Sequence, residues 1–225
     1  MLILEAVGNA LPISIGLALS PFVIATILVI LMTGRARTNA PAFLVGWVLG
    51  FLVVGLLVDL IPEAPDTSGW SKSLPGVVRI ALGLILLLLA IRQWRKRPAP
   101  GEKVIAPKFL ERLDDIGVIK SSVTGFLLSA AHPKNLPLII AGVEAIRISE
   151  LDEGGENIAF AIFTALSSLT IVMPMTWRFM AKEKAEATFG QWKDWLIRHN
   201  GTVLILLLLL LGMLLIGRGM RMLAP

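Results

Sequence analysis

The sequence contains no cysteine. This absence excludes a disulfide framework, a thiolate metal site and a cysteine nucleophile, and it leaves the redox compartment open. The sequence also lacks a nucleophile elbow, a phosphate-binding loop and a set of metal ligands at a recognisable spacing. We therefore expect no enzymatic activity, no cofactor and no metal ion.

What the chain has in excess is apolar residues. They make up 56% of its 225 residues, whereas a soluble domain holds roughly 45 to 50%. Because about 20 apolar residues cross the hydrocarbon of a bilayer, the pattern predicts an all-α integral membrane protein with six transmembrane helices and no separate soluble domain. The expected spans are residues 10–33, 41–61, 75–91, 121–143, 158–177 and 202–216.

The basic residues are distributed unevenly between the two sides of the bilayer. Most of them follow the first, third and fifth spans, while the acidic run at residues 150–156 lies on the other side. Cytoplasmic loops carry the excess of lysine and arginine, so both termini are expected to be extracytoplasmic. The net charge of +5 reflects this topology, and we expect no binding of nucleic acid.

Two segments between spans have the pattern of short helices that lie at the lipid headgroups. Their apolar residues fall on one helical face. These residues are Phe109, Leu110, Leu113 and Ile116 in the first segment, and Phe189, Trp192, Trp195 and Leu196 in the second. Membrane lipids are therefore expected partners. The first segment lies in a linker, residues 95–120, that carries Pro98, Pro100 and Gly101.

The two halves of the chain open with a similar motif. Span one contains G-x-x-L-S followed by Pro21, and span four contains G-x-x-L-S followed, after two more residues and His132, by Pro133. Each half then supplies two further spans, so the halves cross the membrane in opposite senses. This is the inverted-repeat plan of many transporters. We predict a first repeat at residues 1–94 and a second at residues 121–225.

Each proline lies near the middle of its span. A proline removes one helical hydrogen bond and crowds the carbonyl four residues earlier, so backbone groups become free at a depth where only protein or a water-filled cavity can satisfy them. A packed kink is the alternative for either proline alone. The matched pair favours a substrate cavity at a break, with Ser20 and Ser129 beside it.

Lys134 follows the second proline and lies deep in the bilayer. A lysine there costs about 2.5 to 3.5 kcal/mol on insertion scales, and the sequence places no carboxylate at the same depth. An anionic substrate is one candidate partner, and snorkelling to the surface is the alternative. His132 is either a titrating group or a hydrogen-bonded core residue. Asn135 is expected to form an interhelical hydrogen bond or to contact a headgroup.

Small and polar residues on two other spans have open roles. Gly46, Gly50 and Gly55 favour close helix packing, either within one chain or across a homodimer. Thr164, Ser167, Ser168 and Thr170 are consistent with a polar path or with hydrogen bonds between helices.

The stretch Gly125-Phe-Leu-Leu-Ser-Ala-Ala-His-Pro-Lys-Asn-Leu-Pro137 resembles the G-F-x-x-x-x-x-N-P-K motif that opens the fourth helix in the lysine-exporter superfamily. Within it, the chain is most similar to the GAP group, which is named for the addressing of glycopeptidolipids and sulfolipids to the envelope surface. Leu17-Ala-Leu-Ser-Pro21 and the basic loop Gly34-Arg-Ala-Arg37 also resemble that group. One departure is His132, which stands where the motif has asparagine.

The resemblance implies a bacterial cytoplasmic membrane protein that exports or translocates a lipid, a glycolipid or another anionic amphiphile. It implies that Pro21, Pro133, Lys134 and Asn135 form the functional core. Export of a small amino acid or cation is the first alternative, although an amine would call for a central carboxylate. The second alternative is an accessory subunit of an envelope lipid export machine that does not itself transport.

Overall fold

The computed structural model describes residues 2–60, 70–96, 116–149, 151–181 and 183–223, and these residues are almost entirely helical. The helices are α1 (Leu2–Ala18), α2 (Pro21–Met32), α3 (Ala36–Asp59), α4 (Trp70–Arg95), α6 (Val118–Phe126), the π-helical turn η1 (Leu127–Ala131), α7 (Asn135–Arg147), α8 (Glu153–Ser167), α9 (Leu169–Ala181) and α10 (Glu183–Leu223).

Three helical segments in the described residues are long and apolar enough to cross a bilayer without a break. They are Ala36–Asp59 in α3, Gly76–Arg95 in α4 and Gly201–Leu223 in α10. Three further spans consist of bent pairs: α1 with α2 at 57°, α6 and η1 with α7 at 66°, and α8 with α9 at 59°. If each pair is one span, the total is six, as the sequence predicts, and the protein is an all-α, multi-pass membrane protein.

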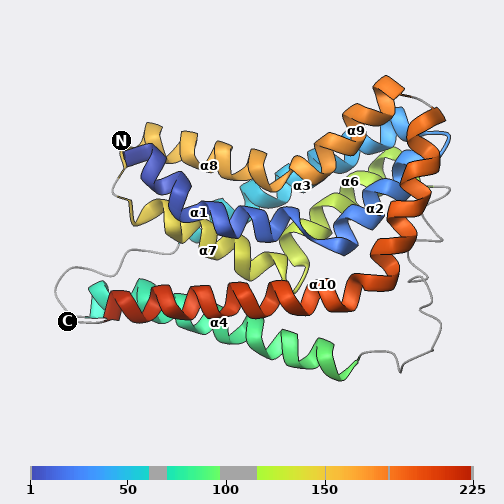
Figure 1. Cartoon of the computed structure of the whole chain (residues 1–225). Coiled ribbons are helices and arrows are strands. Elements are labelled where there is room, and N and C mark those ends of the chain that lie inside the picture. Colours follow the sequence, from blue (N-terminus) through green and yellow to red (C-terminus); the bar gives the residue numbers. More distant parts are fainter. Residues whose placement is uncertain (1, 61–69, 97–115, 150, 182, 224–225) are drawn as a thin grey trace.

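The spans lie roughly along a common direction, and the ends of α1 and α10 that carry the chain termini lie at the same end of the molecule (Figure 1). The first part of α10 turns away from its second part and runs across the opposite end. Phe189, Trp192, Trp195 and Leu196, expected in an interfacial helix, belong to this first part. Phe189 is buried edge-on against Trp177, whereas Trp192 and Trp195 are exposed. The other predicted interfacial segment lies, apart from Ile116, outside the described residues.

Glycines allow two pairs of helices to approach closely. A Cβ atom added at Gly46 would overlap with the carbonyl of Ser122, and one added at Gly125 would overlap with the carbonyl of Phe43. These contacts join α3 to α6 within one chain. The glycines of α4 likewise face α10, where the neighbour of Gly83 is the carbonyl of Gly212. Gly46 and Gly50 therefore serve packing inside the chain.

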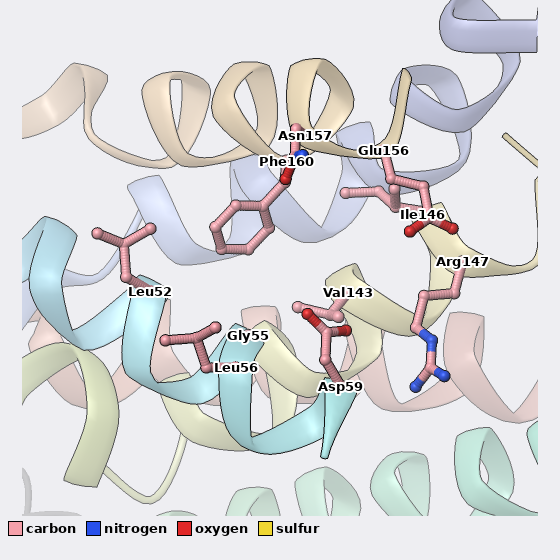
Figure 2. A pocket seen from close by; sticks show the side chains of 10 residues that line it. All are labelled: Leu52, Gly55, Leu56, Asp59, Val143, Ile146, Arg147, Glu156, Asn157 and Phe160. Atoms are coloured by element: carbon pink, nitrogen blue, oxygen red, sulfur yellow. The ribbon is translucent and has the colours of Figure 1, made fainter. Parts of the chain in front are cut away.

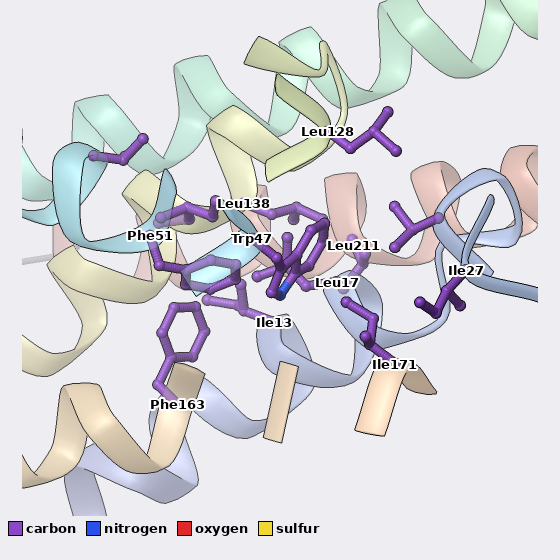
Figure 3. Packing of buried hydrophobic residues seen from close by; sticks show 14 of the residues in the cluster. Ile13, Leu17, Ile27, Trp47, Phe51, Leu128, Leu138, Phe163, Ile171 and Leu211 are labelled. Atoms are coloured by element: carbon purple, nitrogen blue, oxygen red, sulfur yellow. The ribbon is translucent and has the colours of Figure 1, made fainter. Parts of the chain in front are cut away.

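The core is aromatic at its centre. The rings of Trp47, Phe51 and Phe163 contact one another in sequence at tilted angles, with ring centroids 5.5 and 5.7 Å apart, and all three are buried (Figure 3). On the outside, large apolar side chains such as Leu88 and Leu210 are more than half exposed. An apolar exterior of this extent suits contact with lipid chains.

Candidate functional site

The first span breaks where the sequence places a proline. Helix α1 ends at Ala18, and α2 begins at Pro21, which occupies the first turn of that helix. Ser20, the residue before the proline, is extended at φ −84° and ψ 104°, the conformation that a following proline favours. The break leaves the last carbonyl groups of α1 without helical partners in the protein interior. The predicted break at Pro21 is confirmed.

The fourth span breaks at the second proline. The chain widens into the π-helical turn η1, passes through His132 in an extended conformation, and resumes as α7 at Asn135. Side chains of the motif satisfy carbonyls freed here. Asn135 donates from Nδ2 to the carbonyl of Leu128 at 2.7 Å, and Ser129 donates to the carbonyl of Phe126 at 3.0 Å. The break at Pro133 is therefore also confirmed.

Lys134 connects the two breaks. Its side chain is only 2% exposed, and Nζ donates to the carbonyl oxygen of Gly16 at 2.8 Å. The C-terminal end of a helix carries a partial negative charge, so the ammonium group lies where α1 is most negative. The sequence placed no carboxylate at this depth, and the partner is a backbone group that no side-chain pattern reveals.

A third break lies in the fifth span, between α8 and α9. It occurs at Ser168, ahead of Pro174, which lies inside α9. Ser167 and Ser168 donate to carbonyls one turn earlier in α8, at 2.8 and 2.7 Å, and such back-bonding bends helices. Just after the break, Thr170 donates to the carbonyl of Ala18 at 2.6 Å. A second carbonyl at the end of α1 is thus satisfied from another span.

His132 stabilises the turn that begins α7. Its Nδ1 accepts the backbone N–H of Lys134 at 3.3 Å, and its carbonyl accepts the N–H groups of Asn135 and Leu136 at 3.0 Å. The ring stacks on Phe22, with centroids 6.2 Å apart. An asparagine oxygen accepts the N–H two residues ahead in the same way. The histidine therefore supplies the acceptor that the asparagine of the motif would supply.

Three buried polar atoms in the described residues have no hydrogen-bond partner: Trp47 Nε1, Asn135 Oδ1 and Thr164 Oγ1. Asn135 opens α7 next to Lys134, and Thr164 lies one turn before the third break. Unpaired buried polar groups are costly and uncommon. Each of these atoms is able to form one more hydrogen bond with a water molecule or with a polar group of a ligand.

The structure thus brings most of the predicted site residues to the two proline breaks. Ser20, Pro21, Ser129, Lys134 and Asn135 are buried there, whereas His132 is half-buried and Pro133 is exposed. Sequence reasoning did not single out Gly16, Ala18 or Leu128, because their contribution is a carbonyl oxygen. The available signal for these carbonyls was the proline in the middle of each span, because such a proline leaves carbonyl groups without a helical partner.

A separate pocket of about 120 Å³ opens between α3, α7 and α8 near the end that holds the termini (Figure 2). Apolar residues such as Leu52 and Phe160 line one part, and Asp59, Arg147 and Glu156 line another. Arg147 donates to the carbonyl of Val58 at 3.2 Å, so this guanidinium joins α7 to the end of α3. The pocket therefore has an apolar side and a charged side (Figure 2).

A family model described as "Sap, sulfolipid-1-addressing protein" matches residues 10–221 of the chain. The match includes all three breaks and every residue of the candidate site. Neither the curated proteins nor the solved structures contain a match to this chain.

Proposed function

The chain belongs to the sulfolipid-1-addressing protein family, and on this premise we propose that it translocates a lipid or glycolipid with an anionic headgroup across the cytoplasmic membrane. The family description connects the chain with lipid. The broken spans add the transport step, because many transporters bind their substrates where discontinuous helices meet near the middle of the bilayer.

The contact between Lys134 and Gly16 carries this proposal. A buried ammonium group held by a carbonyl can be transferred to a stronger acceptor, and the sulfate or phosphate of a headgroup is such an acceptor. The N-terminal end of α7 follows Lys134 directly and adds positive potential. In our mechanism, the anion displaces the Gly16 carbonyl from Lys134, and the first and fourth spans then separate at their breaks.

The packing of the helices supports an inverted repeat of residues 1–94 and 121–225. Helix α3 of the first half packs on α6 and η1 at the start of the fourth span, and α1 at the start of the first span packs on α8 of the second half. Likewise, α2 packs on α10, and α7 packs on α4. If the two halves are exchanged, the contact of α3 with α6 and η1 corresponds to the contact of α8 with α1, and the contact of α2 with α10 corresponds to the contact of α7 with α4. In inverted-repeat transporters, one repeat moves against the other to give alternating access.

The charge distribution favours this substrate over an amine. The acidic residues of the described spans lie at helix ends: Glu5 in the first turn of α1, Asp59 at the end of α3, Glu144 in the last turn of α7, and Glu153 and Glu156 in the first turn of α8. The charged residue next to a break is Lys134 instead. An exported amine or metal cation would meet an ammonium group at the centre, whereas an anionic headgroup would find its counter-ion there.

The test uses purified protein reconstituted in liposomes that contain a fluorescent sulfated glycolipid. A membrane-impermeant quencher bleaches the outer leaflet, and further bleaching reports movement from the inner leaflet. We expect faster bleaching than in protein-free liposomes for the sulfated lipid, and no acceleration for a fluorescent diacylglycerol. Equal bleaching with and without protein would refute transport by this chain alone and would favour the accessory role.

A further inference from the structure

A second pocket, of about 150 Å³, lies at the end of the molecule opposite the termini. Its lining residues come from the turn between α2 and α3 and from the end of α9, and these segments lie at the right of Figure 1. Its lining residues are Thr33, Gly34, Ala36, Arg37, Arg178 and Phe179. This set contains two arginines and no carboxylate. The pocket is formed by residues distant from the three breaks, and the mechanism above makes no use of it.

Several electrostatic features of the pocket favour an anion. Helix α3 begins at Ala36, so its N-terminal end, which carries a partial positive charge, forms part of the wall. The first turn of α3 holds no acidic residue that would neutralise this charge. Two guanidinium groups add full positive charges and present forked donors that match tetrahedral oxyanions.

The two arginines differ in how they are held. Arg178 donates from Nε to the carbonyl of Leu31, the penultimate residue of α2, at 3.0 Å, and this contact fixes its side chain against the bundle. Arg37 is exposed. Arg178 is therefore held in place on one side of the pocket, while the side chain of Arg37 on the other side is exposed. A headgroup can enter from the membrane surface on the side of Arg37.

Apolar side chains adjoin this charged pocket. Phe179 lines it and is 36% exposed, and Met180, the next residue, is 85% exposed. Both lie in the last turn of α9, on the outside of a membrane-spanning segment. A free anion would gain nothing from contact with these apolar side chains, whereas the acyl chains of a lipid would pack against them.

We propose that this pocket binds the sulfate or phosphate headgroup of an anionic lipid at the membrane surface, with Arg37 and Arg178 as its ligands and Phe179 and Met180 against the acyl chains. The pocket lies on the side that the basic loops assign to the cytoplasm, where an exported lipid would enter the protein. That loading role rests on the function proposed above, whereas the binding of an anionic lipid does not.

The test is calorimetric titration of the purified full-length protein with short-chain phosphatidylglycerol and with a short-chain sulfated glycolipid. Arg37→Gln removes one charged ligand from an exposed position and should leave the fold intact. We expect it to weaken binding of both lipids about tenfold, the loss of one charge-assisted contact. The matched control is Arg92→Gln, which removes an exposed arginine in the last turn of α4, outside the pocket, and should leave affinity unchanged.

Three outcomes would overturn the proposal. Equal weakening by Arg37→Gln and Arg92→Gln would mean that only general surface charge attracts the lipids. Binding of inorganic sulfate as tightly as the lipids would identify a site for a soluble anion. Equal binding of a neutral short-chain diacylglycerol would remove the role of the headgroup.

The loading role is tested apart from binding. If Arg37→Gln loses lipid affinity while transbilayer movement in liposomes stays normal, the loading role is wrong and the transport proposal stands. If the wild-type protein binds the anionic lipids selectively but moves none of them, the transport proposal fails and the binding site stands.

Discussion

Replacement of Lys134 separates the structural role of this residue from its role in transport. In Lys134→Met, an apolar chain of similar length fills the space of a side chain that is 2% exposed. The change removes a buried charge, which relieves about 2.5 to 3.5 kcal/mol on insertion scales. It also removes the hydrogen bond to Gly16, and a bond from a charged donor contributes about 1.5 to 3 kcal/mol. These effects nearly cancel, so we expect the free energy of unfolding to change by less than about 1 kcal/mol.

Lys134→Ala is the matched comparison, because it removes the same charge and the same hydrogen bond but also leaves a cavity. Truncation of a long buried side chain to alanine costs about 2 to 5 kcal/mol, so the alanine variant should be less stable than the methionine variant by roughly that amount. Unfolding of the purified variants in mixed micelles, followed by circular dichroism, gives both values.

Transport should be lost in both variants, because neither offers a cation to the headgroup. Lys134→Arg should keep part of the activity, since the charge remains while its geometry changes. The liposome bleaching assay with the sulfated glycolipid measures each rate. Normal transport by a folded Lys134→Met protein would show that the lysine only joins α7 to α1, and the mechanism by anion exchange would be wrong.

Two further predictions concern the joint between spans one and five and the topology. Thr170→Val should destabilise the protein by about 0.5 to 2 kcal/mol, because the carbonyl of Ala18 loses its interhelical donor. The control is Thr176→Val, because the hydroxyl of Thr176 is exposed and bonds within its own helix; this change should alter the unfolding free energy by less than about 0.5 kcal/mol. Equal effects of the two changes would contradict the proposed role of the contact between Thr170 and Ala18. Because the chain has no native cysteine, a single cysteine at Pro225 should react with an impermeant reagent in intact cells and one at Arg95 should not, and the reverse pattern would show inverted topology.

The six spans and two of the three breaks could be predicted because each depends on a property of single residues. A run of apolar side chains is visible without the fold, and a proline cannot donate a helical hydrogen bond wherever it lies. The third break depends instead on the hydroxyl groups of Ser167 and Ser168, which donate hydrogen bonds to carbonyls of their own helix rather than to another helix. The same hydroxyls can equally pair across helices, as Thr170 does. The sequence therefore left that choice open.

Glycine packing was predictable in kind but not in partner. Gly46 and Gly50 permit close approach on whichever helix face meets them, and this can be in the same chain or in a second copy. What decides between these is the complementary surface, here Gly125 on α6 and the carbonyl groups around it. Hydrogen bonds reinforce the choice, since Asn39 donates to the carbonyl of Ile116 and Ser121 donates to the carbonyl of Asn39.

The partner of Lys134 was the least predictable feature and the one with most bearing on mechanism. A carboxylate at the same depth would have formed a permanent ion pair, which is expensive to break in a medium of low dielectric constant. A carbonyl at a helix end is a weaker acceptor, with only a fraction of a charge. It stabilises the ammonium group well enough for the protein to fold, yet an oxyanion can outcompete it. In the transport cycle proposed above, Lys134 releases its partner each time an anion binds, and the Gly16 carbonyl suits that exchange better than an acidic side chain would.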